Sequence, residues 1–169
     1  MILRIAIWIL MIFGGGILSY YMDKQLFPFI LNDTRFHLIS FIIGFNLLIL
    51  VLRISKNTGK ILAKYGREGN LPRMNTNKFV NKSIYKYMRH PMHLGLLFFP
   101  LSIALLLGSV SFILIIAPAE ILFMLIMIKL VEEPEAKRKF GENYINYMKY
   151  TPWFCLRYEC LKKLLSKNV

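Results

Sequence analysis

The apolar residues of this chain are gathered into four long blocks. The blocks cover residues 2–21, 37–52, 94–107 and 110–131. A helix needs about 20 consecutive apolar residues to cross the hydrocarbon core of a bilayer, with a range of roughly 17–25. The first, second and fourth blocks reach or nearly reach that length, and the third can begin earlier at Pro91, because proline is tolerated in the first turn of a helix. The sequence predicts an all-α, polytopic membrane protein with about four transmembrane helices.

Two of these blocks have an alternative interpretation. The third block has only 14 residues, so it could be a buried helix of a globular domain. The first block could be a secretory signal peptide, but it is longer than a typical signal region and lacks a small-residue cleavage site before Asp23, which favours a retained span. Gly108 and Ser109 separate the last two blocks, and we expect a tight turn there that closes a helical hairpin over residues 93–131.

The chain has a formal net charge of +13, which would also fit a nucleic-acid-binding protein. Residues 55–91 contain nine Lys or Arg and one acid, eight more Lys or Arg follow residue 131, and residues 22–36 hold two charges of each sign. Basic residues concentrate in the cytoplasmic segments of membrane proteins and attract anionic lipid heads. We therefore expect membrane lipids and no nucleic acid as partners, with both termini and a basic loop over residues 55–92 in the cytoplasm.

Charged and imidazole groups flank the predicted hairpin. Polar residues in or beside membrane spans are costly and are candidates for function by default. Arg89, His90 and His93 lie at the start of the third span, and Glu132 and Glu133 follow the fourth. Because a hairpin brings the outer ends of its two helices together, we expect the histidines and the glutamates to meet.

These groups also have simpler interpretations. Glu133 could be a solvated helix-end charge paired with Lys137 four residues later. A metal site on the two histidines is disfavoured, because zinc takes three or four protein ligands and no third histidine or cysteine lies nearby in the sequence. Glu120 lies inside the fourth block, where a carboxylate must be protonated or paired. The sequence assigns it no role.

The segment after the fourth block predicts two surface helices. Phe140, Tyr144 and Tyr147 recur at helical spacing within residues 137–154 and predict one face of an interfacial helix, although an aromatic belt at the membrane surface gives the same pattern. Residues 153–165 combine apolar positions at helical spacing with basic neighbours. That pattern is typical of an amphipathic helix lying on the membrane.

The two cysteines, Cys155 and Cys160, fall in this tail. Disulfides are rare in the cytoplasm, where we expect the tail to lie, and neither cysteine is spaced with histidines for metal binding. The sequence therefore predicts two ordinary apolar residues.

Taken in order, these segments resemble the signature of the integral membrane methyltransferases, which include isoprenylcysteine carboxyl methyltransferases and phospholipid methyltransferases. The residues that carry the resemblance are Arg89, His90, Pro91, Gly95, Glu132, Glu133, Phe140, Gly141, Tyr144, Tyr147 and Pro152. Each group alone is a weak signal, but the groups in register at this spacing are specific. They lie within residues 84–154, a little under half of the chain.

The resemblance implies S-adenosyl-L-methionine as cofactor, held under a tail of residues 132–169, and a lipophilic methyl acceptor that arrives from the bilayer. The apolar blocks place the first two spans in residues 1–54 of a single membrane domain over residues 1–169. The resemblance implies catalytic roles for Arg89, His93 and Glu133. The residues it implies for cofactor binding are Arg89, His90, Pro91, Gly95, Glu132, Glu133, Tyr144 and Tyr147. These types suit the ligand, because a cationic cofactor favours carboxylates and aromatic faces and its own carboxylate favours guanidinium or imidazole.

Two positions depart from the family pattern. His93 stands where the family usually has tyrosine, and Lys149 followed by Tyr150 stands where it tends to have a run of arginines. The second departure makes carboxyl methylation less expected, and an amine or phenol acceptor more so. Two other classes are weighed against methyl transfer. One is a nicotinamide-dependent sterol or isoprenoid reductase, which is normally larger, and the other is a non-catalytic lipid-binding membrane protein.

Overall fold

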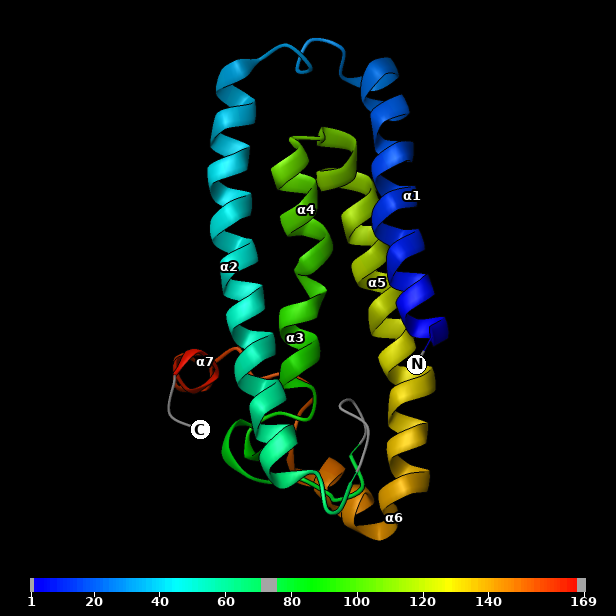
Figure 1. Ribbon diagram of the computed structural model, residues 1–169, viewed down its shortest axis with the longest axis vertical. Helices are drawn as coiled ribbons and strands as arrows, with labels where there is room; N and C mark the ends of the chain where they lie inside the picture. Colours follow the sequence, from blue (N-terminus) through cyan, green and yellow to red (C-terminus); the bar gives the residue numbers. More distant parts are fainter. Residues whose placement is uncertain (1, 71–75, 167–169) are drawn as a thin grey trace. The chain divides into compact units, whose positions relative to one another are not determined.

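The computed structural model describes residues 2–70 and 76–166, and within those ranges it contains helices and no strand (Figure 1). The contacts divide the chain into two compact units. Unit 1 comprises Met1–Leu50 and Leu97–Leu125, and unit 2 comprises Val51–Leu96 and Ile126–Val169. The all-α prediction is confirmed for the described residues.

Three helices are long and apolar enough to cross a membrane. They are Ala6–Leu26 within α1 (Ile2–Leu26), α2 (Thr34–Tyr65) and the helical stretch Phe112–Tyr150, which is kinked at Gly141, where the backbone is non-helical with φ 54° and ψ −136°. In each of these helices, at most 22% of the most apolar 18-residue segment is buried inside the protein. Exposed apolar surface of this extent would make a protein aggregate in water. The helix Pro91–Leu107 is also apolar, but shorter. These features indicate a membrane protein.

Unit 1 contains the turn that the sequence predicted at Gly108 and Ser109. The helix α4 (Phe99–Leu107) ends at Gly108, which adopts the left-handed conformation with φ 63°. Glycine adopts this conformation at little cost. The next helical segment begins at Val110, so α4 and α5 (Ala117–Met127) are joined as a hairpin.

Close packing of α1 in unit 1 depends on a second glycine. Gly15 faces Glu120 of α5, and a Cβ at this position would lie 2.9 Å from Glu120 Oε1. Glu120 is buried, and its Oε2 has no hydrogen-bond partner among the described residues. The absence of a side chain at Gly15 therefore makes room for the intramembrane carboxyl group.

Prolines account for the irregular turns in the apolar helices. The helix α3 (Pro91–Leu97) is separated from α4 at Phe98, because the ring of Pro100 disrupts the backbone bonding of the preceding turn. Two π-helical segments, η2 (Phe112–Ile116) and η3 (Ile128–Glu132), each end two residues before a proline, Pro118 or Pro134. Local π turns allow a membrane helix to satisfy the backbone groups that a proline leaves unpaired.

Unit 2 has its own apolar core, built from four short stretches of chain. They are the second half of α2, the segment around η1 (Ser83–Lys86), α3, and α7 (Tyr158–Leu165). The buried residues of this core are Ile54, Ile61, Val80, Ile84, Tyr85, Met88, Leu94, Cys160 and Leu164. This core fixes the segment that carries Arg89 and His90.

Part of the segment predicted to be a basic loop, residues 55–92, is helical. The helix α2 continues to Tyr65, although the apolar block ends at residue 52. Ile54, Thr58 and Ile61 are buried and lie on one face of the helix at positions i, i+4 and i+7. Packing of that face in unit 2 therefore extends the helix through residues expected in the loop.

The tail contains less helix than the sequence predicted. The helix α6 (Glu133–Tyr150) ends at Tyr150, and Thr151 is extended with φ −116° and ψ 121°. Proline disfavours helical backbone in the residue before it, and Pro152 therefore ends the helix. The predicted helix over residues 153–165 is shortened to α7, because residues 151–157 are non-helical.

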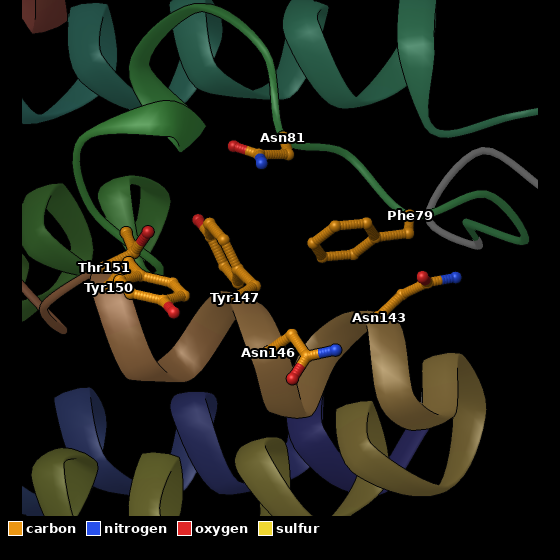
Figure 2. A pocket seen from close by; sticks show the side chains of 7 residues that line it. All are labelled: Phe79, Asn81, Asn143, Asn146, Tyr147, Tyr150 and Thr151. Atoms are coloured by element: carbon orange, nitrogen blue, oxygen red, sulfur yellow. The ribbon is translucent and has the colours of Figure 1, made fainter.

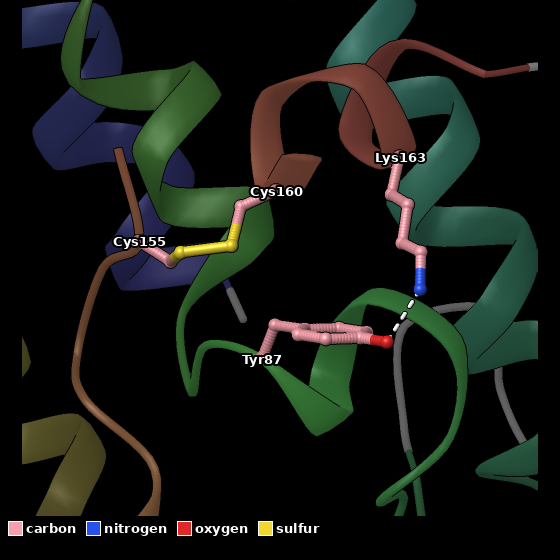
Figure 3. Close-up of a disulfide and its surroundings, with 4 residues drawn as sticks. All are labelled: Tyr87, Cys155, Cys160 and Lys163. Atoms are coloured by element: carbon pink, nitrogen blue, oxygen red, sulfur yellow. Dashed lines mark hydrogen bonds between the residues drawn. A yellow bond between two sulfur atoms is a disulfide. The ribbon is translucent and has the colours of Figure 1, made fainter. Parts of the chain in front are cut away.

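The expectation of two unpaired cysteines is also wrong. Figure 3 shows a disulfide between Cys155 and Cys160, whose Cα atoms are 6.0 Å apart. The extended chain before α7 places Cys155 against the first turn of that helix, within bonding distance of the buried Cys160. Next to it, Lys163 of α7 donates a hydrogen bond to the hydroxyl of Tyr87. These contacts fasten α7 to unit 2.

Candidate functional site

A buried cluster of polar side chains lies in unit 2, where the segment before α3 meets the start of α6. Arg89 and His90 directly precede α3, and Glu133 is the first residue of α6. Glu133 Oε1 accepts from Arg89 Nη2 at 3.1 Å and from His90 Nε2 at 3.2 Å. All three side chains are about 8% exposed. The structure thus brings together groups that lie more than 40 residues apart, as the hairpin predicts.

Because this cluster is buried, the stability of the protein is sensitive to the loss of any one of its charged groups. Removing one partner of a buried ion pair costs about 3–5 kcal/mol, because the other charge is left unpaired. The Nε of Arg89 is buried and has no hydrogen-bond partner among the described residues. Since most buried polar atoms in proteins are hydrogen-bonded, this unused donor is a point where a ligand could bind.

His90 is neutral at physiological pH. Burial holds its pKa at about 3, far below its ordinary value, and the neighbouring His93 and Arg89 lower it further. A neutral imidazole carries a single N–H. If Nε2 donates this hydrogen to Glu133, Nδ1 remains as an acceptor.

The extended segment after α6 covers the cluster. The backbone amides of Arg89 and His90 donate to the carbonyls of Pro152 and Trp153 at 2.9 and 3.1 Å. The imidazole of His90 lies 6.2 Å from the Trp153 ring and 6.5 Å from the Phe154 ring, measured between centroids. Sequence analysis missed Trp153 and Phe154 as site residues. Pro152, which precedes them, was the available signal, because it ends α6 and begins an extended segment.

The predicted aromatic face of α6 packs on one ring. Phe79 contacts Phe140, Tyr144 and Tyr147 at centroid distances of 5.8, 6.3 and 5.1 Å. Tyr147 also donates through its hydroxyl to the carbonyl of Met88 at 3.2 Å. Both tyrosine rings are buried, and the hydroxyl of Tyr147 fixes the segment before Arg89 through its hydrogen bond to Met88.

The model of the phospholipid methyltransferase family matches residues 37–143 of this chain, well over half of its length. The chain belongs to the phospholipid methyltransferase family. The resemblance seen in the sequence is therefore confirmed at this level. The matched region contains the Arg89, His90 and Glu133 cluster and ends one residue before Tyr144. Searches among curated proteins and among solved structures gave no significant match.

In this member of the family, Pro91 and Gly95 serve the scaffold of unit 2. Pro91 is fully buried and is the first residue of α3, a position that suits its fixed φ. A Cβ on Gly95 would lie 2.7 Å from Cγ2 of Ile54, so the missing side chain lets α3 pack closely on α2. Their expected contact with a cofactor stays a prediction.

The remaining predicted residues border the cluster. The ring of His93 is 5.5 Å from that of His90, nearly perpendicular to it, and is half-buried. Of the two glutamates, Glu133 contacts Arg89 and His90, whereas Glu132 is half-buried beside it. Across the described ranges, no group of three or more His, Cys, Asp or Glu side chains could hold a metal ion.

Proposed function

We propose that the protein transfers a methyl group from S-adenosylmethionine to a lipophilic acceptor at the cytoplasmic face of the membrane. Membership of the phospholipid methyltransferase family supports methyl transfer and a lipid-like acceptor. The observation that carries the proposal is the buried cluster of Arg89, His90 and Glu133 under an aromatic cover. An ion pair of this kind adds little to stability compared with apolar side chains of the same volume, which favours a ligand-binding role.

The proposed topology has four membrane spans with both termini in the cytoplasm. Three helices are long enough to cross, and Pro91–Leu107 supplies the fourth as one arm of the hairpin. The concentration of Lys and Arg in residues 55–91 and after residue 131 supports the orientation. On this topology, α6 and α7 lie at the cytoplasmic surface.

The residues of the cluster fit the cofactor chemically. The unpartnered Nε of Arg89 can donate to an amino-acid carboxylate. The carboxylate of Glu133 and the rings of Trp153 and Tyr144 offer the negative charge and aromatic faces that the ammonium of the cofactor's amino-acid moiety prefers. When bound, the cofactor supplies an activated methyl group on a sulfonium. Arg89, His90 and Glu133 would hold the part that carries no reacting atom, which leaves the methyl free to face the acceptor.

Positioning and exclusion of water are the contributions that this site can make to an in-line displacement. The backbone bonds from Arg89 and His90 to residues 152 and 153 hold the cover in place. We assign His93 as the group that takes a proton from an amine or phenol acceptor, because it is half-buried next to the cluster. Lys149, which replaces the arginine usual in the family, makes a carboxylate acceptor less favourable than a phospholipid-like amine.

Two measurements test the proposal. Labelled methyl from S-adenosylmethionine should appear in a membrane lipid extract incubated with the purified protein. S-adenosylhomocysteine should bind the protein by titration calorimetry, and His90→Ala and Glu133→Gln should each weaken that binding about ten- to a hundredfold, because hydrogen bonds to charged groups contribute roughly 1.5–3 kcal/mol.

Glu142→Gln is the matched control, since Glu142 is an exposed carboxylate on the same helix. It should bind S-adenosylhomocysteine as the wild type does. Absence of binding to the wild type would overturn the proposal. Binding of a reduced nicotinamide nucleotide instead would identify a reductase.

A further inference from the structure

The two cysteines of the chain form a disulfide in the tail that covers the polar cluster of unit 2. The proposed topology places this tail in the cytoplasm, where small-molecule thiols keep most cysteines reduced. The disulfides that do occur in cytoplasmic proteins are usually transient, and they sense redox conditions or take part in catalysis. The link between Cys155 and Cys160 is therefore a candidate for a reversible modification site.

The disulfide directly follows the residues that cover the cluster. The rings of Trp153 and Phe154, which we call the aromatic cover, lie beside the imidazole of His90. Cys155 is the next residue along the chain, and its side chain packs against the apolar core of unit 2 together with that of Phe154. A change in how Cys155 is held therefore acts on the aromatic cover.

The disulfide shortens the part of this segment that can move. Figure 2 shows Thr151 at the end of α6, where it is buried. Beyond the aromatic cover, Cys155 is linked to Cys160, which is 4% exposed and belongs to the core of unit 2. With the link, residues 152–154 lie between two fixed points. Without it, residues 152–157 form a longer connection between α6 and α7.

The two sulfur atoms differ in access and in environment. Cys155 is half-buried, so a small thiol can reach its sulfur. Cys160 is buried in the first turn of α7, where the positive end of the helix dipole stabilises a thiolate. A stabilised thiolate is a good leaving group in thiol–disulfide exchange. The environment therefore favours attack on Cys155 and release of Cys160.

We propose that Cys155 and Cys160 are a reversible thiol–disulfide site that clamps the aromatic cover over the polar cluster under oxidising conditions. The inference rests on the proposed function, because it makes oxidation slow the exchange of the cofactor that the cluster holds. In a reducing cytoplasm the dithiol form, whose cover is free to open, is the form that exchanges cofactor.

The reaction uses a small-molecule thiol of the glutathione class as co-reactant. One thiolate attacks the sulfur of Cys155, the bond between the two cysteines breaks, and Cys160 leaves as a thiolate. A second thiolate attacks the small-molecule sulfur of the mixed disulfide and displaces Cys155. The protein sulfurs gain two electrons and two protons, and the two small thiols lose them as they join in a disulfide. The small-molecule disulfide drives the reverse reaction.

The test uses the full-length protein with Trp8→Phe, which leaves Trp153 as its single tryptophan, in mixtures of reduced and oxidised glutathione. Mass spectrometry after maleimide labelling gives the fraction of protein with the disulfide. Quenching of Trp153 fluorescence by iodide reports on the aromatic cover without requiring a cofactor. The release of labelled S-adenosylhomocysteine into an excess of unlabelled compound gives the rate of exchange.

The oxidised protein should show a lower quenching constant for Trp153 than the reduced protein. S-adenosylhomocysteine should also dissociate more slowly from the oxidised protein, by up to about thirtyfold, which is the limit that the chain-entropy relation sets for so short a loop. The matched control replaces Cys155 by Ser and Cys160 by Ala. Both quantities should stay at the values of the reduced protein in this control, whatever the glutathione mixture.

The outcomes separate this inference from the proposed function. If the disulfide forms and opens while the quenching constant of Trp153 stays the same, or if the cysteines stay reduced in oxidised glutathione, the clamp is overturned, and the proposed function stands as long as S-adenosylhomocysteine binds. Equal dissociation rates in the two forms would overturn the control of cofactor exchange. If quenching follows the disulfide but S-adenosylhomocysteine binds neither form, the clamp holds and the proposed function fails.

Discussion

The two units of the molecule use their buried polar groups differently. In unit 1, the buried side chains of Ser40 and Asp23 bond to the backbone of neighbouring helices. Ser40 Oγ donates to the Leu105 carbonyl at 2.7 Å, and Asp23 Oδ1 accepts from the Ser111 amide at 2.7 Å. In unit 2, by contrast, Arg89 and His90 bond to the side chain of Glu133.

The difference separates polar groups that hold a fold from polar groups that are available to a ligand. A side chain that bonds to the backbone of another helix uses its hydrogen bond to join two helices. Such bonds also satisfy backbone groups, which are costly to leave unpaired in a membrane. The cluster of unit 2 keeps charged groups and an unused guanidinium donor out of water. We expect substitutions of Ser40 and Asp23 to change stability alone, and those at the cluster to change stability and ligand binding together.

The largest loss of stability is expected for Glu133→Ala. This change leaves the guanidinium of Arg89 buried with no counter-charge, at a cost of about 3–5 kcal/mol in the free energy of unfolding. Equilibrium unfolding in detergent measures it, with Glu142→Ala as the exposed control on the same helix. A loss below about 1 kcal/mol would show that the pair is not buried as described.

Removal of the disulfide should have the next largest effect. Replacing Cys155 by Ser and Cys160 by Ala opens a short loop, and the chain-entropy relation gives a loss of about 2 kcal/mol. Thermal unfolding with and without reductant measures it. Reductant should lower the melting temperature of the wild type and leave the double variant unchanged. Equal melting temperatures for all four samples would contradict the covalent link.

Asp23→Ala tests unit 1. It removes the acceptor for the Ser111 amide at the start of a helix, and loss of such a cap costs about 0.5–2 kcal/mol. Asp23→Asn keeps an acceptor oxygen and should lose less. Affinity for S-adenosylhomocysteine should stay at the wild-type value in both variants. A tenfold change would show that Asp23 of unit 1 also affects ligand binding.

The smallest expected effect is the change in stability with pH that comes from His90. The pKa of His90 is about 3 in the folded protein, against an ordinary value of 6.5, so the unfolded chain binds a proton throughout that window and the folded chain does not. Stability therefore falls as pH decreases through it, by about 0.7 kcal/mol between pH 7 and pH 6. His90→Gln should lack this component. An identical pH dependence in wild type and variant would show that His90 titrates normally.

Sequence alone predicted the features that follow from local pattern. The turn at Gly108 follows from a glycine between two apolar blocks, and the meeting of His90 with Glu133 follows from the hairpin. The common packing of Tyr144 and Tyr147 follows from helical spacing, whereas Phe140 precedes the kink at Gly141 and packs on the same ring for another reason. The partner they share, Phe79, lies in a polar loop with no periodic signal.

Other features depend on contacts between distant parts of the chain. The cover formed by Trp153 and Phe154 requires backbone bonds to Arg89 and His90, which no spacing in the tail encodes. The extension of α2 to Tyr65 requires a partner core in unit 2. The disulfide between Cys155 and Cys160 has only their short separation in the sequence as its signal, and disulfides are rare in the cytoplasm, where the charge pattern places the tail.

The measurement that tests the central claim most directly uses a double variant, Arg89→Met with Glu133→Leu. Replacing a buried ion pair by apolar side chains is often neutral for stability, so this protein should unfold with a free energy close to that of the wild type. Its affinity for S-adenosylhomocysteine, measured by titration calorimetry, should fall at least about a hundredfold, because two charged hydrogen-bonding groups are lost. Wild-type affinity in the folded double variant would contradict the account and leave the cluster as an ion pair that only joins α6 to the segment before α3.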